Sequence, residues 1–193
     1  MNEFWNENFK VGYYDKIVKK GLYNKRGIQS FWHITTLSNV SNYIKKDTNH
    51  LDYACGPGTL IGLFSNAKST GVDISKKQII HANKNYGDKG NFYSLDNFQL
   101  EKHHNKYDTI TILGLIEFLN HDEIKELINK LDKCLVVGGK IVLTTPNFGG
   151  FMKILEKFLN IFGSVDYSQQ HINKFNTSSF KELSKTFTNY EPQ

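Results

Sequence analysis

The chain has 193 residues, 39% hydrophobic and 13% aromatic, which is enough for one domain with a packed core. Its net charge of +5 comes almost wholly from lysine, and because Arg26 is the only arginine, the usual tool for bidentate phosphate and guanine contacts is scarce. We therefore expect that the protein does not act on nucleic acid. No stretch approaches the roughly 20 apolar residues of a membrane span, and the first residues lack a signal-peptide layout. Because two cysteines cannot make a disulfide framework either, a cytoplasmic protein is expected.

The pattern of apolar residues divides this single domain into three regions. Residues 1–48 form a helical, aromatic-rich lead-in or cap. Residues 49–146 alternate short apolar strands with helical segments, and residues 147–193 are mainly helical. Alternation of this kind predicts an α/β fold with a doubly wound, mostly parallel sheet.

Within the middle region the expected elements follow one another at short intervals. Strands are predicted over 50–54, 69–73, 91–95, 107–113 and 140–145. One helix begins near Thr59, and a second follows Ser75, with Gln78 completing a capping box. A third, amphipathic helix is expected over 122–135, with Gly138-Gly139 ending it, and a last helix near 178–185.

The first predicted strand runs into a glycine turn, in the stretch Leu51-Asp52-Tyr53-Ala54-Cys55-Gly56-Pro57-Gly58. Glycines let the backbone pass close to a ligand, and the following helix start offers free N–H donors. Asp52, just before the turn, is placed to accept hydrogen bonds from the loop. An ordinary strand-to-helix turn would have the same pattern, so this motif alone favours ligand binding only weakly.

Acidic residues stand at the ends of the next two predicted strands. Asp73, in Gly71-Val72-Asp73-Ile74, is placed to accept hydrogen bonds from ribose hydroxyls. Asp96 ends the third strand, where a surface turn is an equally good interpretation. Asp108 begins the fourth strand at the opposite end of the sheet, so we expect it to be structural. Together, the strand ends place glycines and acids on one side of the crevice where the strand order reverses.

With these motifs the sequence resembles a class I S-adenosylmethionine-dependent methyltransferase, and is similar to the ubiquinone- and menaquinone-type enzymes and their small-molecule relatives. The resemblance covers roughly residues 49–146 well and 165–188 loosely. Besides the glycine turn and Gly71-Val72-Asp73, it is carried by Tyr107-Asp108-Thr109-Ile110, Ile116-Glu117-Phe118-Leu119 and Gly138-Gly139-Lys140-Ile141-Val142-Leu143-Thr144-Thr145-Pro146-Asn147. It implies a Rossmann-like fold, S-adenosyl-L-methionine as cofactor, and methyl transfer to a small-molecule or lipid-like acceptor.

The resemblance also implies roles for individual residues around the cofactor. Glycine-turn residues would line its methionine part, Asp73 would hold the ribose, and Leu113 would close the pocket. Ala54 stands where the family usually has a glycine. The implied cofactor-binding residues are Asp52, Ala54, Gly56, Gly58, Asp73, Ile74, Asp96 and Leu113. Some ubiquinone-type members carry a Glu-x-x-Glu-His metal cluster after the fourth strand, but here only Glu117 remains of it, so no metal is expected.

Catalysis would need little from the protein, because a sulfonium is already an activated electrophile and the remaining work is positioning and desolvation. A base is required only for a weakly acidic acceptor. The candidates are His33, Glu117 and His171, and a structural or surface role is the alternative for each. His171 stands out because His171-Ile172-Asn173-Lys174-Phe175 resembles the segment that borders the acceptor pocket in related enzymes.

Two other functions compete with methyl transfer. A non-catalytic S-adenosylmethionine-binding or interaction protein would share the same turn and strand ends. A nicotinamide-dependent oxidoreductase would need a G-x-G-x-x-G fingerprint, but position 61 is Ile61, and Gly62 comes one residue late.

The C-terminal region carries two further expectations. Phe151 to Phe162 is predicted as an amphipathic helix on the acceptor side, whose apolar face would meet an apolar acceptor or a membrane surface. The family sheet ends in a sixth and a seventh strand, and residues 186–193 leave room for at most one. We therefore expect that the gene continues beyond this chain and that the fifth strand has an exposed edge.

Overall fold

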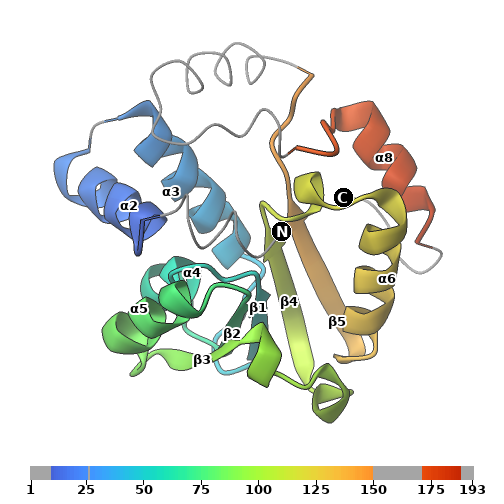
Figure 1. Cartoon of the computed structure of the whole chain (residues 1–193), viewed down its shortest axis with the longest axis horizontal. Helices are drawn as coiled ribbons and strands as arrows, with labels where there is room; N and C mark the ends of the chain where they lie inside the picture. The colour runs from blue at the N-terminus through green and yellow to red at the C-terminus, as the bar shows by residue number, and fades with distance from the viewer. Residues whose placement is uncertain (1–9, 26, 150–170, 188–193) are drawn as a thin grey trace. The chain divides into compact units, whose positions relative to one another are not determined.

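The computed structural model describes residues 10–25, 27–149 and 171–187, which include a five-stranded sheet of order β3-β2-β1-β4-β5 (Figure 1). The chain builds outward from β1 to β2 and β3, then returns to the other side of β1 for β4. This reversal between β1 and β4 is the switch point of a doubly wound sheet, where ligands bind at the carboxyl ends of the strands. The predicted α/β class with a parallel, doubly wound sheet is confirmed.

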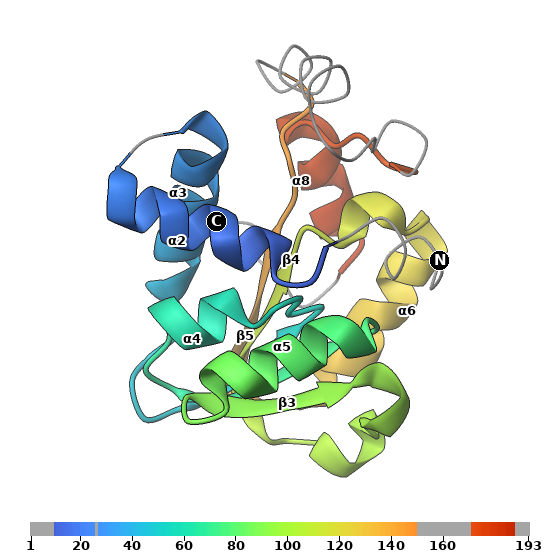
Figure 2. The same cartoon turned by 60° about the vertical axis from the view of Figure 1, so that its left-hand side comes forward.

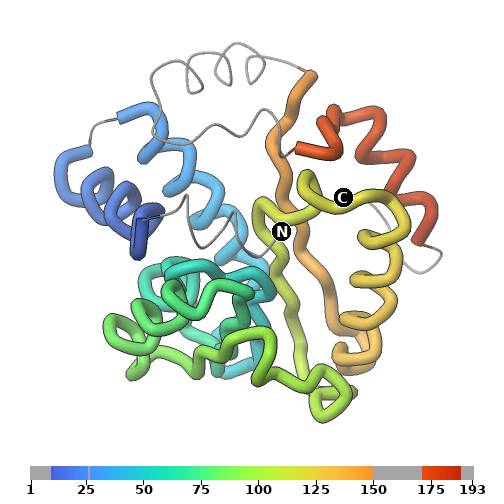
Figure 3. Tube along the Cα trace, viewed as in Figure 1, coloured from blue at the N-terminus to red at the C-terminus, as the bar shows by residue number. Residues whose placement is uncertain are grey.

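Strands β1 to β4 lie within one residue of their predicted bounds, whereas β5 begins five residues earlier than predicted. The pairs β1–β2, β1–β4 and β2–β3 are parallel, and Asp52 stands opposite Gly71 on one side and Thr111 on the other. The tube in Figure 3 follows the chain from β3 through two short 3₁₀ turns into β4. The strand bounds are β1 Asn49–Tyr53, β2 Lys68–Asp73, β3 Gly90–Ser94, β4 Tyr107–Leu113 and β5 Leu135–Thr144.

Along the chain, the six described helices precede, separate and follow these strands. The described part of the lead-in contains α2 and α3, as its aromatic, helical pattern predicts. Figure 2 shows α5 lying along β3, with α4 beside it. The helices are α2 Tyr13–Asn24, α3 Ile28–Ser41, α4 Thr59–Phe64, α5 Lys76–Tyr86, α6 His121–Asp132 and α8 Thr177–Lys185; the 3₁₀ turns are η1 Leu95–Asn97, η2 Leu100–His103 and η3 Ile116–Phe118.

The chain divides into two compact units. The first comprises residues 1–112 and 130–142, and the second residues 113–129 and 143–193. In the first unit an apolar cluster packs α4 and α5 onto the sheet next to the glycine turn, and burial of such side chains stabilises the fold by about 1.5–3 kcal/mol each. Its members are Cys55, Ile61, Ile79, Ala82, Tyr86 and Phe92.

Two local predictions are wrong. The helix expected over 122–135 ends at Asp132, and Gly138-Gly139 lies inside β5. The strand begins early because the Cys134 carbonyl accepts N–H groups of Lys106 and Tyr107, which aligns this part of the chain with the start of β4. The capping box at the start of α5 is absent: Ser75 is the N-cap residue, but its side chain makes no capping hydrogen bond. The Gln78 side chain instead accepts the N–H of Gly12, at 3.0 Å.

The described residues contain a capping box that the sequence analysis missed. The Asn176 side chain accepts the N–H of Ser179, and Ser179 accepts the N–H of Asn176, which fixes the start of α8. Among the described helices, none is long and apolar enough to cross a bilayer. The predicted helix over 151–162 and most of the expected C-terminal strand lie outside the described residues.

Candidate functional site

The glycine turn between β1 and α4 has an alternating left-handed backbone. Ala54, Gly56 and Gly58 have φ angles of 65°, 52° and 78°. Alanine rarely adopts this conformation, because its Cβ crowds the backbone. At Gly56 the space that a side chain would occupy is open, whereas at Gly58 it is filled by the rings of Phe92 at 2.7 Å. A ligand can therefore approach the backbone at Gly56, while Gly58 serves the packing beneath the loop.

Asp73, the last residue of β2, holds this turn in place. One carboxylate oxygen accepts the N–H of Gly56 at 2.8 Å, and the other accepts the N–H of Ser75 at 2.8 Å. Burial raises the pKa of Asp73, and these hydrogen bonds from the backbone counteract it in part. A carboxylate has about four acceptor positions, so Asp73 keeps capacity for a further donor, such as a ribose hydroxyl. Ile74 follows it and is half-buried.

Asp52, in β1, receives a different hydrogen bond from the one expected. Its carboxylate is only 2% exposed and accepts the Thr111 hydroxyl of β4 at 2.6 Å, whereas the loop N–H of Gly56 goes to Asp73. Burial raises the pKa of Asp52 to about 7, and the neighbouring charge of Asp73 adds to the rise. Asp52 and Asp73 are thus two adjacent carboxylates, and a cation near them would be stabilised.

The hydrogen bond to Asp52 is the last in a buried series that crosses the sheet. His50 lies between Ser69 and Thr111, with both ring nitrogens 3.0 Å from a hydroxyl oxygen. Burial lowers the pKa of His50 to about 4, so the ring is neutral at pH 7. Because Thr111 donates to Asp52, it must accept from Nε2–H of His50, and Nδ1 then accepts from Ser69. The sequence analysis missed His50 and Thr111, although alternation along paired strands places them on one face.

The remaining predicted cofactor residues have less specific surroundings. Asp96 lies in η1, after β3, and its exposed carboxylate forms an ion pair of 3.0 Å with Lys76 at the start of α5. Leu113 is the last residue of β4, is half-buried and belongs to the second unit. Asp108 accepts the N–H of Asn49 at 2.9 Å, which joins the amino ends of β4 and β1 and agrees with a structural role.

The second unit contains two of the three candidate bases. The Glu117 carbonyl accepts the N–H groups of Ile172 and Asn173, at 2.9 and 3.0 Å, so η3 and the segment after position 171 are joined. The His171 ring lies against Phe118 and Phe148, with ring centres 5.0 and 5.3 Å apart. This segment is therefore held by backbone hydrogen bonds and aromatic packing.

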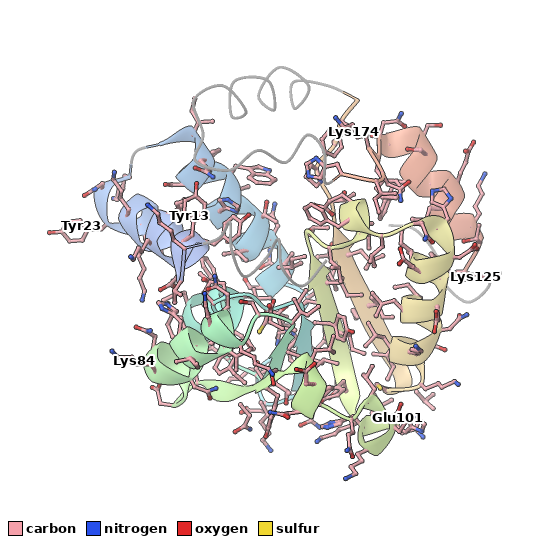
Figure 4. The ribbon with its side chains drawn as sticks, in the orientation of Figure 1. Tyr13, Tyr23, Lys84, Glu101, Lys125 and Lys174 are labelled. Atoms are coloured by element: carbon pink, nitrogen blue, oxygen red, sulfur yellow. The ribbon has the colours of Figure 1, made fainter. Side chains whose placement is uncertain are left out.

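Phe148 also contacts a cation and a backbone carbonyl of the same segment. Lys174, labelled in Figure 4, places its ammonium 5.7 Å from the centre of the Phe148 ring. The Phe148 N–H is bonded to the carbonyl of Phe175. Phe148 thus contacts both His171 and Lys174, within the second unit.

Glu117 differs from an ordinary surface glutamate. Its side chain is 3% exposed, and burial raises its pKa to about 7. The hydroxyl of Thr145 is close enough to favour the charged form, but the two groups do not have hydrogen-bond geometry, and Glu117 Oε2 and Thr145 Oγ1 are both buried without a partner. Buried polar atoms of this kind are unusual in folded proteins, and binding of a polar group would satisfy them.

His33, the third candidate, lies on α3 in the first unit. Burial lowers its pKa to about 4, and its Nε2 is buried without a hydrogen-bond partner. Its ring packs against Tyr14 of α2 and the neighbouring Trp32. Within the described ranges, no three His, Cys, Asp or Glu side chains gather closely enough to hold a metal ion.

Comparison with known proteins shows to which family the chain belongs and which solved structures share its fold. A family model described as "Methyltransferase domain" matches residues 26–187. The chain is 28% identical over 136 residues to malonyl-[acyl-carrier protein] O-methyltransferase 1 of Ilyobacter polytropus, a match that covers 66% of this chain and 49% of the relative. The chain thus spans about half the length of this curated relative.

Solved structures show the same fold at low sequence identity. The magnesium protoporphyrin IX methyltransferase of Synechocystis, solved with bound SAH, superposes with a TM-score of 0.63 at 17% identity, covering 96% of this chain and 86% of the other. A SAM-dependent methyltransferase from Archaeoglobus fulgidus gives a TM-score of 0.61 at 18% identity, covering 81% and 67%.

Proposed function

The chain belongs to the family of methyltransferase domains, and we propose that it transfers the methyl group of S-adenosylmethionine to an oxygen, nitrogen or carbon atom of a small-molecule or lipid-like acceptor. The hydrogen bond from Gly56 to Asp73 is the observation that carries this proposal. It joins the turn after β1 to the acidic end of β2, next to the switch point between β1 and β4.

Each residue around the turn has a role in the proposal. The carboxylate of Asp73 accepts the ribose hydroxyls, since both of its oxygens retain lone pairs. The open space over Gly56 lets the methionine part approach the backbone. Asp52 supplies negative charge for the cationic part of the cofactor. Ala54, Gly58, Ile74, Asp96 and Leu113 remain proposed cofactor residues.

The cofactor supplies an activated methyl group, so the protein has to orient the acceptor, exclude water and take up a proton where the acceptor carries one. For the last task we favour Glu117 over His171 and His33. A base works best when its pKa lies near the working pH, and the pKa of Glu117 is raised to about 7 whereas that of His33 is lowered to about 4. The unpartnered Oε2 of Glu117 is also available to accept an acceptor's O–H.

For the acceptor, the name of the curated relative supports one class above the others. That protein is an O-methyltransferase of a malonyl group on a carrier protein. We therefore propose an oxygen atom of an acyl or other small-molecule acceptor as the first class to test, in the free and in the carrier-bound form.

Binding and turnover test the proposal separately. Isothermal titration should show binding of S-adenosylmethionine and none of NADH. Asp73→Ala should weaken binding about tenfold to a hundredfold, because a charged hydrogen-bond acceptor contributes about 1.5–3 kcal/mol. Asp108→Ala is the matched control, since Asp108 also accepts a backbone N–H, that of Asn49 at 2.9 Å, and should leave affinity unchanged.

A screen for S-adenosylhomocysteine release across acceptor classes then decides between enzyme and binding protein. Release with any acceptor supports the enzyme. Binding of S-adenosylmethionine without release of S-adenosylhomocysteine with any acceptor class would favour the non-catalytic alternative. An unchanged affinity of Asp73→Ala for S-adenosylmethionine would overturn the assignment of the cofactor pocket.

A further inference from the structure

Asp15, on α2, is a buried carboxylate that receives hydrogen bonds from three helices. It is 2% exposed. Its oxygens lie 3.0 Å from Lys19 Nζ, 3.1 Å from His81 Nε2 and 3.4 Å from the Thr59 hydroxyl, and the Tyr86 hydroxyl donates a further, short hydrogen bond. Lys19 belongs to α2, Thr59 to α4, and His81 and Tyr86 to α5. One side chain thus connects the lead-in helix to α4, which follows the glycine turn, and to α5.

These donors keep Asp15 charged despite its burial. Burial by itself would raise the pKa of Asp15, but the hydrogen bonds from Tyr86, Lys19 and His81 lower it below the usual value. A buried carboxylate is costly unless it is fully hydrogen-bonded. Asp15 therefore holds its partners strongly, and loss of any one of them leaves part of its charge uncompensated.

Two glycines make room for the side chains that reach Asp15. A Cβ on Gly62 of α4 would lie 2.2 Å from the ring of Tyr86, and a Cβ on Gly12 would lie 2.5 Å from the ring of His81. Both distances are far below van der Waals contact. Gly62, which follows the glycine turn one residue too late for a dinucleotide fingerprint, thus has a packing role of its own.

The network also reaches the turn itself, through Thr59. Thr59 is the first residue of α4 and follows Gly58 directly. The Gly58 N–H is bonded to the Cys55 carbonyl at 3.0 Å, and Phe92 packs against Gly58 from beneath. A shift of Thr59 would therefore be transmitted to the turn at residues 54–58.

We propose that Asp15 is a positioning residue for the cofactor-binding turn: through Thr59 and Tyr86 it fixes the start of α4, and with it the backbone of residues 54–58. This inference rests on the proposed function. It adds a helix that lies before the family match, which begins at residue 26. Figure 2 shows α2 next to α4 and α5, as the contacts of α2 with α4 and the hydrogen bonds of Asp15 with His81 and Tyr86 require.

Three variants and one matched control test this role through S-adenosylhomocysteine binding, measured by calorimetry. Asp15→Asn and Thr59→Val should each weaken binding about fivefold, as expected for coupling through a packed network, and Thr59→Ser, which keeps the hydroxyl, should restore it. Ser30→Ala is the control: Ser30 donates to the Ile17 carbonyl at 3.0 Å and so ties α2 to α3 without touching Thr59. It should lower the melting temperature and leave affinity within twofold.

A second readout needs no cofactor. In the free protein, amide hydrogen exchange of a peptide covering residues 54–62 should rise in Asp15→Asn and Thr59→Val but stay unchanged in Ser30→Ala. If wild-type protein binds no S-adenosylhomocysteine, the proposed function is wrong. The hydrogen-exchange measurement still tests whether Asp15 positions the turn. Variants that lose thermal stability but keep both wild-type affinity and wild-type exchange would overturn the inference.

Discussion

Thr111 on β4 lies directly opposite Asp52 on β1, and its hydroxyl donates a 2.6 Å hydrogen bond to the buried Asp52 carboxylate. The Asp52 side chain has a raised pKa, because burial disfavours its charged form more than Thr111 stabilises it. The Thr111 hydroxyl thus stabilises a buried carboxylate in the middle of the sheet. Substitutions of either residue should change the free energy of unfolding and its dependence on pH.

Thr111→Val should destabilise the protein by about 1.5–3 kcal/mol at pH 8, because a buried charged acceptor loses its donor while the side-chain shape is kept. His50 loses its partner at Nε2 in the same variant. Urea unfolding measures the change. Thr111→Ser, which keeps the hydroxyl, is the control and should recover most of the loss; equal stabilities of the Val and Ser variants would contradict this account.

Asp52→Asn should change the pH dependence of stability. The pKa of Asp52 is about 7 in the folded protein against 3.8 for the unperturbed group, so between these values the folded chain binds more protons than the unfolded chain. The free energy of unfolding of the wild type therefore falls as pH rises from about 4 to about 7, by at most about 1.4 kcal/mol per pH unit from this group.

The Asn variant lacks this proton, so its free energy of unfolding relative to wild type should increase with pH across the same window and level off above about pH 7. Urea unfolding at half-unit pH steps gives the difference. A difference that stays constant from pH 4 to 8 would show that Asp52 titrates normally.

Ala54→Gly should stabilise the protein. A left-handed φ of 65° costs an alanine about 1–2 kcal/mol, while the greater freedom of glycine in the unfolded chain offsets about 0.4–1 kcal/mol of the gain. We expect a net gain of about 0.5–1 kcal/mol in urea unfolding. Ala67→Gly, at a position without a positive φ, should be destabilising, and a loss of stability in both variants would refute the strain at Ala54.

Glu117→Gln should lower the rate about a hundredfold or more with an acceptor that has a weakly acidic hydroxyl. A base must be ionised, so the wild-type rate should rise with pH through an apparent pKa near 7, and the Gln variant should lack this rise. Thr145→Val should move the rise to higher pH, since Thr145 lowers the pKa of Glu117. Glu123→Gln, at the exposed start of α6, is the matched control, and a wild-type pH profile in Glu117→Gln would eliminate this residue as the base.

The sequence alone determined the order of strands and helices and the position of the glycine turn. These features depend on local rules: period-two and period-3.6 alternation, glycines at a tight turn, and an acid at a strand end. Tyr107–Leu113 was predicted to the residue, because its aromatic and aliphatic side chains at 107, 110, 112 and 113 fall on both faces, as is typical of a strand buried on both sides. The position of Asp73 at the end of β2 was also predicted from local pattern.

Only the tertiary structure decided which polar groups meet. Gln78 pairs with Gly12, 66 residues away, in place of Ser75 three residues away, because α2 packs against α5. Asp15 and Tyr86 are 71 residues apart, and Asp52 and Thr111 are 59 apart. Local patterns carry no information on such pairs, since a buried polar group is satisfied by whichever donor the packing of distant segments brings within reach.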